Sequence, residues 1–182
     1  MKELITKASS LVTSSFVRKG DGLYVSVVPS AASIDIVYPA IQSIMDIGLS
    51  YTGLPNLHVT VIYSSTTVKD VDAMYRSAEI DPAKKYLAVI ERFEYWAGHK
   101  NQGVLVLKMK SPALEAVHYS LREDGFEVNY PDYQAHMTFI DDLHEQGFDE
   151  EKSKKLLQFL NSTFSLAGKT LELTGMKAEA VN

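Results

Sequence analysis

Two short segments of the chain each place a histidine and a threonine two residues apart. One reads HVT at residues 58–60 and the other HMT at residues 136–138, and two apolar residues follow each of them. Residues two apart on a β-strand project from the same face, so each imidazole would lie beside a hydroxyl. Imidazoles titrate near neutral pH, and hydroxyls donate hydrogen bonds to phosphate oxygens. The two segments therefore predict phosphoryl transfer without a metal, with one histidine as base, the other as acid, and the threonines holding the phosphate.

Two matching sets of elements carry these segments. The apolar periodicities and turn residues predict, in the first half, a strand at 23–27, a helix at 33–48 and a strand at 57–63. In the second half they predict a strand at 104–110, a helix at 114–124 and a strand at 135–140. The same order recurs with an offset of roughly 80 residues, which is typical of an internal duplication.

The remaining segments complete an α+β fold. We expect a long strand at 85–96 that pairs with the strand after Gly103, a surface helix at 150–160 and a last strand at 171–179. The duplication predicts two pseudo-symmetric lobes, each an antiparallel sheet with outer helices, and an active-site cleft between them. We expect residues 1–182 to form one bilobal domain, with residues 1–20 as a candidate flexible N-terminal segment.

At the two motifs the chain resembles the 2H phosphoesterase superfamily. That superfamily is defined by a pair of H-x-T/S motifs, each followed by hydrophobic residues, on two symmetric lobes, and HVTVI and HMTFI match both in full. The duplicated part covers residues 23–140, most of the chain. The resemblance implies that His58 and His136 are the catalytic acid and base, and that Thr60 and Thr138 bind the phosphate.

Within the superfamily the chain is most similar to the phage anti-CBASS phosphodiesterases, which degrade cyclic di- and trinucleotide immune signals. The resemblance implies base-holding aromatics at Tyr24, on the first predicted strand, and at Trp96, the only tryptophan. Stacking of a base on an aromatic contributes about 1 to 3 kcal/mol and tolerates different bases. Lys108 alternates with apolar strand residues and is a candidate phosphate cation. Each of these three side chains also fits an ordinary place at the surface of a sheet.

Composition and charge restrict the partners. With 18 Lys and Arg against 23 Asp and Glu, the net charge of -5 disfavours long nucleic acid, whose binding depends on phosphate neutralisation.

There is no cysteine, so disulfides, thiolate zinc sites and a cysteine nucleophile are excluded. Asp141 and Asp142 lack further ligands at metal-binding spacing, so we expect neither a metal nor a cofactor. The first twenty residues are too polar for a signal peptide or a membrane span, which predicts a cytoplasmic protein, in the host cytoplasm if phage-encoded.

Two other functions fit the same motifs. A 2',3'-cyclic phosphodiesterase or 2',5'-RNA ligase-like enzyme would act on RNA ends, but should need a more basic surface. A sponge would bind cyclic nucleotides without cleaving them, and it would not need both motifs intact. The preferred prediction is thus a cyclic-oligonucleotide phosphodiesterase; the motifs leave the ring size, the bases and the oligomeric state open.

Overall fold

The computed structural model describes residues 22–64, 83–97, 102–128 and 132–181. The segment 1–20 lies outside these ranges, as do residues 98–101, which connect the strand expected at 85–96 to the strand after Gly103. Within them the chain forms β1 (Gly22–Pro29), α2 (Ala31–Asp46), the 3-10 helix η1 (Leu54–Asn56), β2 (Val59–Ser64), β3 (Tyr86–Trp96), β4 (Val104–Lys110), α4 (Pro112–Glu123), β5 (His136–Ile140), α5 (Glu150–Thr163) and β6 (Thr170–Val181).

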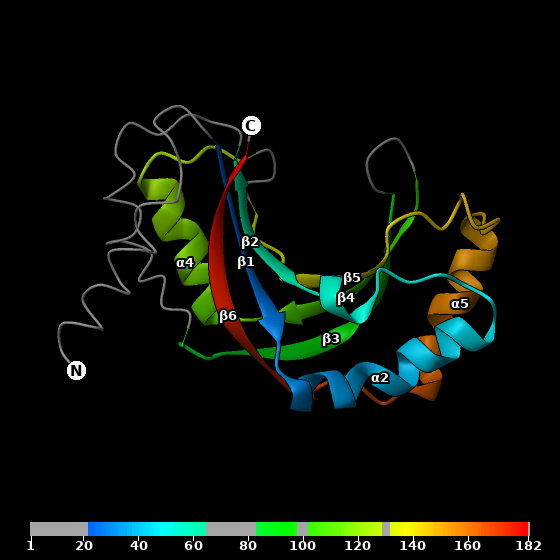
Figure 1. Cartoon of the computed structure of the whole chain (residues 1–182). Helices are drawn as coiled ribbons and strands as arrows, with labels where there is room; N and C mark the ends of the chain where they lie inside the picture. Colours follow the sequence, from blue (N-terminus) through cyan, green and yellow to red (C-terminus); the bar gives the residue numbers. More distant parts are fainter. Residues whose placement is uncertain (1–21, 65–82, 98–101, 129–131, 182) are drawn as a thin grey trace.

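The six strands form one continuous antiparallel sheet. Their order is β1-β2-β5-β4-β3-β6, and β6 returns to β1, so the ring of pairings is closed. Two three-stranded halves are recognisable, β2-β1-β6 and β5-β4-β3, and they meet at two junctions. Four residue pairs join β3 to β6, but a single pair joins β2 to β5. The predicted α+β fold is confirmed, and the two expected sheets are continuous with each other (Figure 1).

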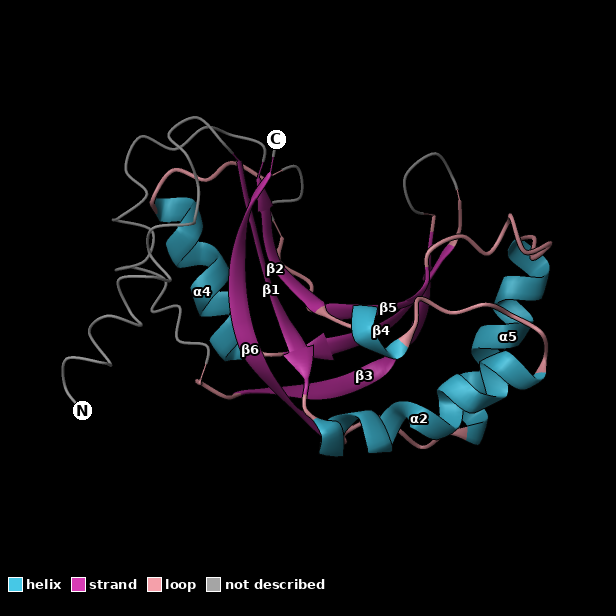
Figure 2. Cartoon of the chain, viewed as in Figure 1, coloured by secondary structure: helices cyan, strands magenta, loops and turns pink. Residues whose placement is uncertain are grey.

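The two halves repeat the same strand-helix-strand order. The unit β1-α2-β2 corresponds to β4-α4-β5, as the duplication in the sequence predicts. Helix α2 packs on β1 and β6, α4 on β2 and β3, and α5 on β3. Figure 2 shows these helices on the convex side of the strongly bent sheet. None of the helices in the described ranges is long and apolar enough to span a bilayer.

Side-chain caps begin the two equivalent helices. The Ser30 hydroxyl accepts a hydrogen bond from the Ser33 amide, so α2 begins two residues before the predicted start at residue 33. The earlier start places Pro39 inside the helix, where it is exposed and the carbonyl that it leaves unpaired can bind water. In the second half the Ser111 hydroxyl caps α4, and Pro112 occupies its first turn.

The core lies between the helices and the convex face of the sheet. On β2 and β5, alternate residues are buried, whereas the motif histidines and threonines are only partly buried. The buried residues of these two strands and of the helix stripes that face them include Val59, Val61, Met137, Phe139, Val37, Ile41, Ile44, Leu114 and Leu121. This alternation directs the motif side chains away from the helices, to the concave face.

One buried histidine ties α4 to the strand that carries the first motif. The His118 ring lies with its Nδ1 2.7 Å from the Val61 carbonyl oxygen and stacks on Tyr133 at 4.8 Å between ring centroids. Tyr133 in turn donates a hydrogen bond to the Thr60 carbonyl, at 3.2 Å. Burial lowers the pKa of His118, although the hydrogen bond to Val61 acts to raise it.

The His118 environment predicts acid sensitivity of the fold. Because its pKa is lower in the folded chain than in the unfolded chain, the unfolded state binds more protons between the two values, and stability falls as the pH drops below about 6.5. We expect the unfolding free energy of the wild type to fall more steeply between pH 7 and pH 5 than that of His118→Gln, by at most about 1.4 kcal/mol per pH unit. Urea unfolding curves at several pH values measure the unfolding free energy of both proteins. If the free energies of the wild type and of His118→Gln changed in parallel with pH, this account would be contradicted.

Candidate active site

The junction between β2 and β5 brings the two H-x-T motifs together. Their central residues, Val59 and Met137, are paired across the two strands, and both are fully buried. In an antiparallel pair the flanking residues also oppose each other, at about 4.5 to 5.5 Å between Cβ atoms. The flanking positions are His58 with Thr138, and Thr60 with His136. The four side chains named from the sequence therefore lie on one face, each histidine beside the threonine of the other motif.

Both motif histidines are held in the same way. His58 Nδ1 lies 2.7 Å from the Asn56 carbonyl oxygen, and His136 Nδ1 lies 2.8 Å from that of Gln134. A carbonyl can only accept, so each Nδ1 carries the hydrogen and donates it. This fixes the orientation of each ring and leaves Nε2 as the nitrogen that can gain or lose a proton.

The environment of His136 favours its neutral form. Burial lowers the pKa of His136, the hydrogen bond to the Gln134 carbonyl acts to raise it, and the charge of the His58 imidazolium lowers it further. The two rings lie diagonally across the β2–β5 junction, which is why the charge of one acts on the other. His136 is therefore suited to accept a proton at neutral pH.

Each motif histidine has an aromatic neighbour that was singled out from the sequence. The Trp96 ring lies 4.4 Å from the His136 ring, between centroids, at an interplanar angle of 57°. Tyr24 lies 6.0 Å from His58 in an edge-on arrangement, and its hydroxyl is 3.3 Å from Thr60 Oγ1. The two aromatics thus flank the paired motifs from β3 and β1.

Lys108 lies near the motifs, but its charge is already paired. Its backbone is opposite His136 in the β4–β5 pairing. Its amino group is 3.5 Å from Glu94 Oε1 and 3.9 Å from Glu91 Oε2, and the side chain is 23% exposed. Either carboxylate would have to share Lys108 with a bound phosphate, which weakens the case for it as a phosphate cation.

The reasoning from sequence missed two residues of this region. Glu94 accepts hydrogen bonds from both Trp96 and Arg92, and the only available signal was its place two residues before Trp96 on one strand. Tyr63 lies opposite Tyr24 on β2, with ring centroids 6.3 Å apart, and is 52% exposed. The only signal in the sequence was a tyrosine close after the first motif.

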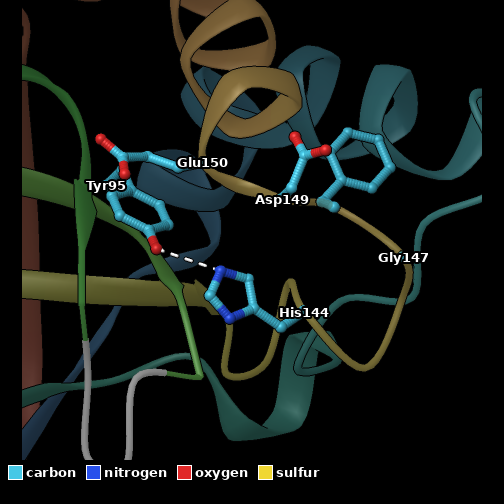
Figure 3. Close-up of a pocket in the computed structure, with 6 residues that line it drawn as sticks. Tyr95, His144, Gly147, Asp149 and Glu150 are labelled. Atoms are coloured by element: carbon cyan, nitrogen blue, oxygen red, sulfur yellow. Dashed lines mark hydrogen bonds between the residues drawn. The ribbon is translucent and has the colours of Figure 1, made fainter.

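A cavity of about 350 Å³ lies elsewhere, beside the start of α5 (Figure 3). Tyr95 and His144 line it, with the tyrosine hydroxyl 3.2 Å from His144 Nε2. Tyr95 and Trp96 are adjacent on β3, so their side chains project from opposite faces of the strand. A glycine is required at position 103, next to the Tyr95 ring. Its φ is +73°, and a Cβ there would lie 2.9 Å from that ring. The cavity is separate from the motif residues.

Comparison with known protein families identifies the family to which this chain belongs. The family model described as anti-CBASS protein Acb1 matches residues 21–163, more than half of the chain and both motifs. The chain belongs to the Acb1 family. The Acb1 protein of Vibrio phage KVP40 is 33% identical over 81 residues, a match that covers 44% of this chain and 48% of the phage protein. The matched segment thus spans about half the length of that Acb1 relative.

Solved structures show the fold of this Acb1 family member in more distant proteins. E. coli LigT complexed with phosphate aligns with a TM-score of 0.53 at 13% identity, over 90% of this chain and 88% of LigT. Kluyveromyces marxianus Usb1 aligns with a TM-score of 0.52 at 12% identity, over 90% of this chain and 98% of Usb1. Both are members of the 2H phosphoesterase superfamily, so the resemblance seen at the motifs is confirmed at the level of the fold.

The coupling between the two histidines is measurable. In His58→Ala we expect the pKa of His136 to rise, because one of the two causes that lower it is the charge of His58. The rise should be partial, since burial of His136 is the larger cause. NMR titration of the histidine ring signals measures it, with the buried His118 as an internal reference that should not move. An unchanged His136 titration would show that the charge of His58 does not act on His136.

Proposed function

We propose that this protein is a metal-independent phosphodiesterase of the 2H type that opens a 3',5'-phosphodiester of a cyclic di- or trinucleotide. The observation that carries the proposal is the pairing of Val59 with Met137, because it juxtaposes both His/Thr motifs on one face. Membership of the Acb1 family supports the substrate class, since the family is described as anti-CBASS. A phage protein of this kind would act in the host cytoplasm, where it would remove the cyclic nucleotide signal.

The acid and base roles follow from the surroundings of the two rings. We assign the base to His136, whose Nε2 stays unprotonated because burial lowers its pKa. It takes the proton of a ribose 2'-hydroxyl, and the oxygen attacks the adjacent phosphorus. The bond from phosphorus to O5' breaks, and His58 in its protonated form gives a proton to the leaving O5'. The products are a 2',3'-cyclic phosphate and a free 5'-hydroxyl, with no metal required for either proton transfer.

The two threonines stabilise the charge that develops on the phosphate. Thr60 and Thr138 each lie opposite a motif histidine, so their hydroxyls reach the same region as the Nε2 atoms. Hydroxyl donors aimed at the non-bridging oxygens favour the transition state over the ground state. The hydroxyl of Tyr24, 3.3 Å from Thr60 Oγ1, accepts or donates a hydrogen bond that orients the threonine.

The flanking aromatics favour a substrate with two bases. Trp96 and Tyr24 lie on opposite sides of the paired motifs, beside His136 and His58 respectively. A ring placed on each side of the scissile phosphate can stack the two bases of a cyclic dinucleotide. A net charge of -5 agrees with a small ligand held by stacking better than with a long polyanion held by neutralisation.

Product analysis on a panel of substrates tests the function. We expect cyclic dinucleotides or trinucleotides to be cleaved in excess EDTA to products that carry 2',3'-cyclic phosphate or 3'-phosphate ends, because the imidazoles make both proton transfers. Cleavage of RNA 2',3'-cyclic phosphate ends alone would favour the enzyme on RNA ends. Binding without cleavage would favour a sponge. Loss of turnover in EDTA that one divalent ion restores would overturn the metal-independent mechanism.

Replacement of the histidines tests the assignment of the site. His58→Ala and His136→Ala should each lower turnover by about 10² to 10⁴-fold, the usual contribution of a positioned acid or base. The double variant should lose much less than the product of the two, because the pair acts as a unit. His144→Ala is the matched control, since this histidine bonds Tyr95 in the separate cavity. A folded single variant with wild-type turnover would make that histidine structural.

A further inference from the structure

The strand that carries Trp96 also carries a carboxylate with an unusual number of donors. Glu94 is only 17% exposed, and its two oxygens have different partners. Oε2 accepts a hydrogen bond from Trp96 Nε1 at 2.8 Å. Oε1 accepts bonds from Arg92 Nε at 2.9 Å and Nη2 at 2.6 Å, and Lys108 Nζ lies 3.5 Å from it. One oxygen thus binds the indole while the other is held by cations.

These partners keep Glu94 ionised and fixed. Burial acts to raise its pKa, but the hydrogen bonds from Trp96 and Arg92 and the charge of Lys108 outweigh it and lower the pKa. Hydrogen bonds to an ionised acceptor are shorter and about twice as strong as neutral ones. The indole therefore bonds to an acceptor that is itself held from the other side.

Two of the residues that Glu94 contacts, Trp96 and Lys108, also lie next to His136. Trp96 packs against the His136 ring, and Lys108 is opposite His136 across the β4–β5 pairing. A tryptophan side chain turns about two torsions, and a hydrogen bond from Nε1 to a fixed acceptor selects one combination of them. Without that bond the indole would be held only by apolar contact near the end of β3.

We propose that Glu94 is a positioning residue that holds the Trp96 indole against His136 in the orientation in which it receives a base. Its effect on substrate rests on the proposed function. Its effect on the indole itself does not, because the hydrogen bond from Nε1 exists in the free protein.

The first experiment measures the indole in the free protein. Trp96 is the only tryptophan, so its fluorescence reports on this position alone. In Glu94→Met we expect greater quenching by acrylamide and lower emission anisotropy than in the wild type. Glu91→Gln is the matched control: it removes a carboxylate next to Lys108 on the same strand without a contact to Trp96, and should leave both signals unchanged. Unchanged quenching in a folded Glu94→Met protein would overturn the proposal.

The second experiment measures the coupling of Glu94 to Trp96 in binding. The probe is a cyclic dinucleotide with both phosphates replaced by phosphorothioate, titrated by calorimetry. Glu94→Met should weaken binding about tenfold, the effect of one charge-assisted hydrogen bond. In the Trp96→Phe background the same substitution should have no further effect, because phenylalanine has no Nε1 hydrogen to be held. Equal weakening in both backgrounds would show that Glu94 acts without Trp96 and would overturn the proposal.

A substitute variant and the behaviour of the wild type keep the two experiments decisive. If Glu94→Met does not fold, Glu94→Asp keeps the charge, is one methylene too short to reach Nε1, and should give the same increase in quenching. If the wild type neither binds nor cleaves cyclic nucleotides, the proposed function fails. The quenching result then decides alone whether Glu94 positions the indole.

Discussion

The pairing of Val59 with Met137 is the contact on which the site depends. It is the only residue pair that joins β2 to β5 among the described residues, and it lies at the centre of both motifs. A shift of one residue in this register would turn the motif side chains into the core and expose the buried central residues. The burial of both central residues opposes such a shift, so the hydrophobic core sets the register that aligns the histidines.

The rest of the fold supports this junction from the convex side. Helix α4 belongs to the second half, yet it packs on β2 of the first half, and His118 bonds there to the Val61 carbonyl. Tyr133, in the segment before β5, reaches the Thr60 carbonyl. Each of these bonds links the half that contains one motif to the strand of the other motif. They stabilise a junction whose own ladder is too short to do so.

Local patterns in the sequence predicted the elements and the two motifs, because alternation, helix caps and turn residues act over a few positions. These local patterns do not predict features that depend on residues far apart in the sequence. Nothing near Tyr86 or Thr170 indicated that β3 and β6 would pair and make the two sheets continuous. Glu94 was missed because its role comes from the partners Arg92 and Lys108, and Lys108 lies on another strand. Tyr63 was missed because its place beside Tyr24 depends on the β1–β2 register, which shifts between Val25 and Ser26.

Duplication supplies two similar groups, whereas the proposed mechanism gives them opposite roles, one as base and one as acid. Each histidine has the same hydrogen bond to the carbonyl two residues before it, so that bond cannot distinguish them. The surroundings of the two rings differ in the aromatic side chain that lies beside each of them. His136 is packed against an indole at 4.4 Å, whereas His58 has Tyr24 edge-on at 6.0 Å. Asymmetry contributed by β1 and β3, outside the motifs, thus gives the two rings different surroundings, which the proposed division into one base and one acid requires.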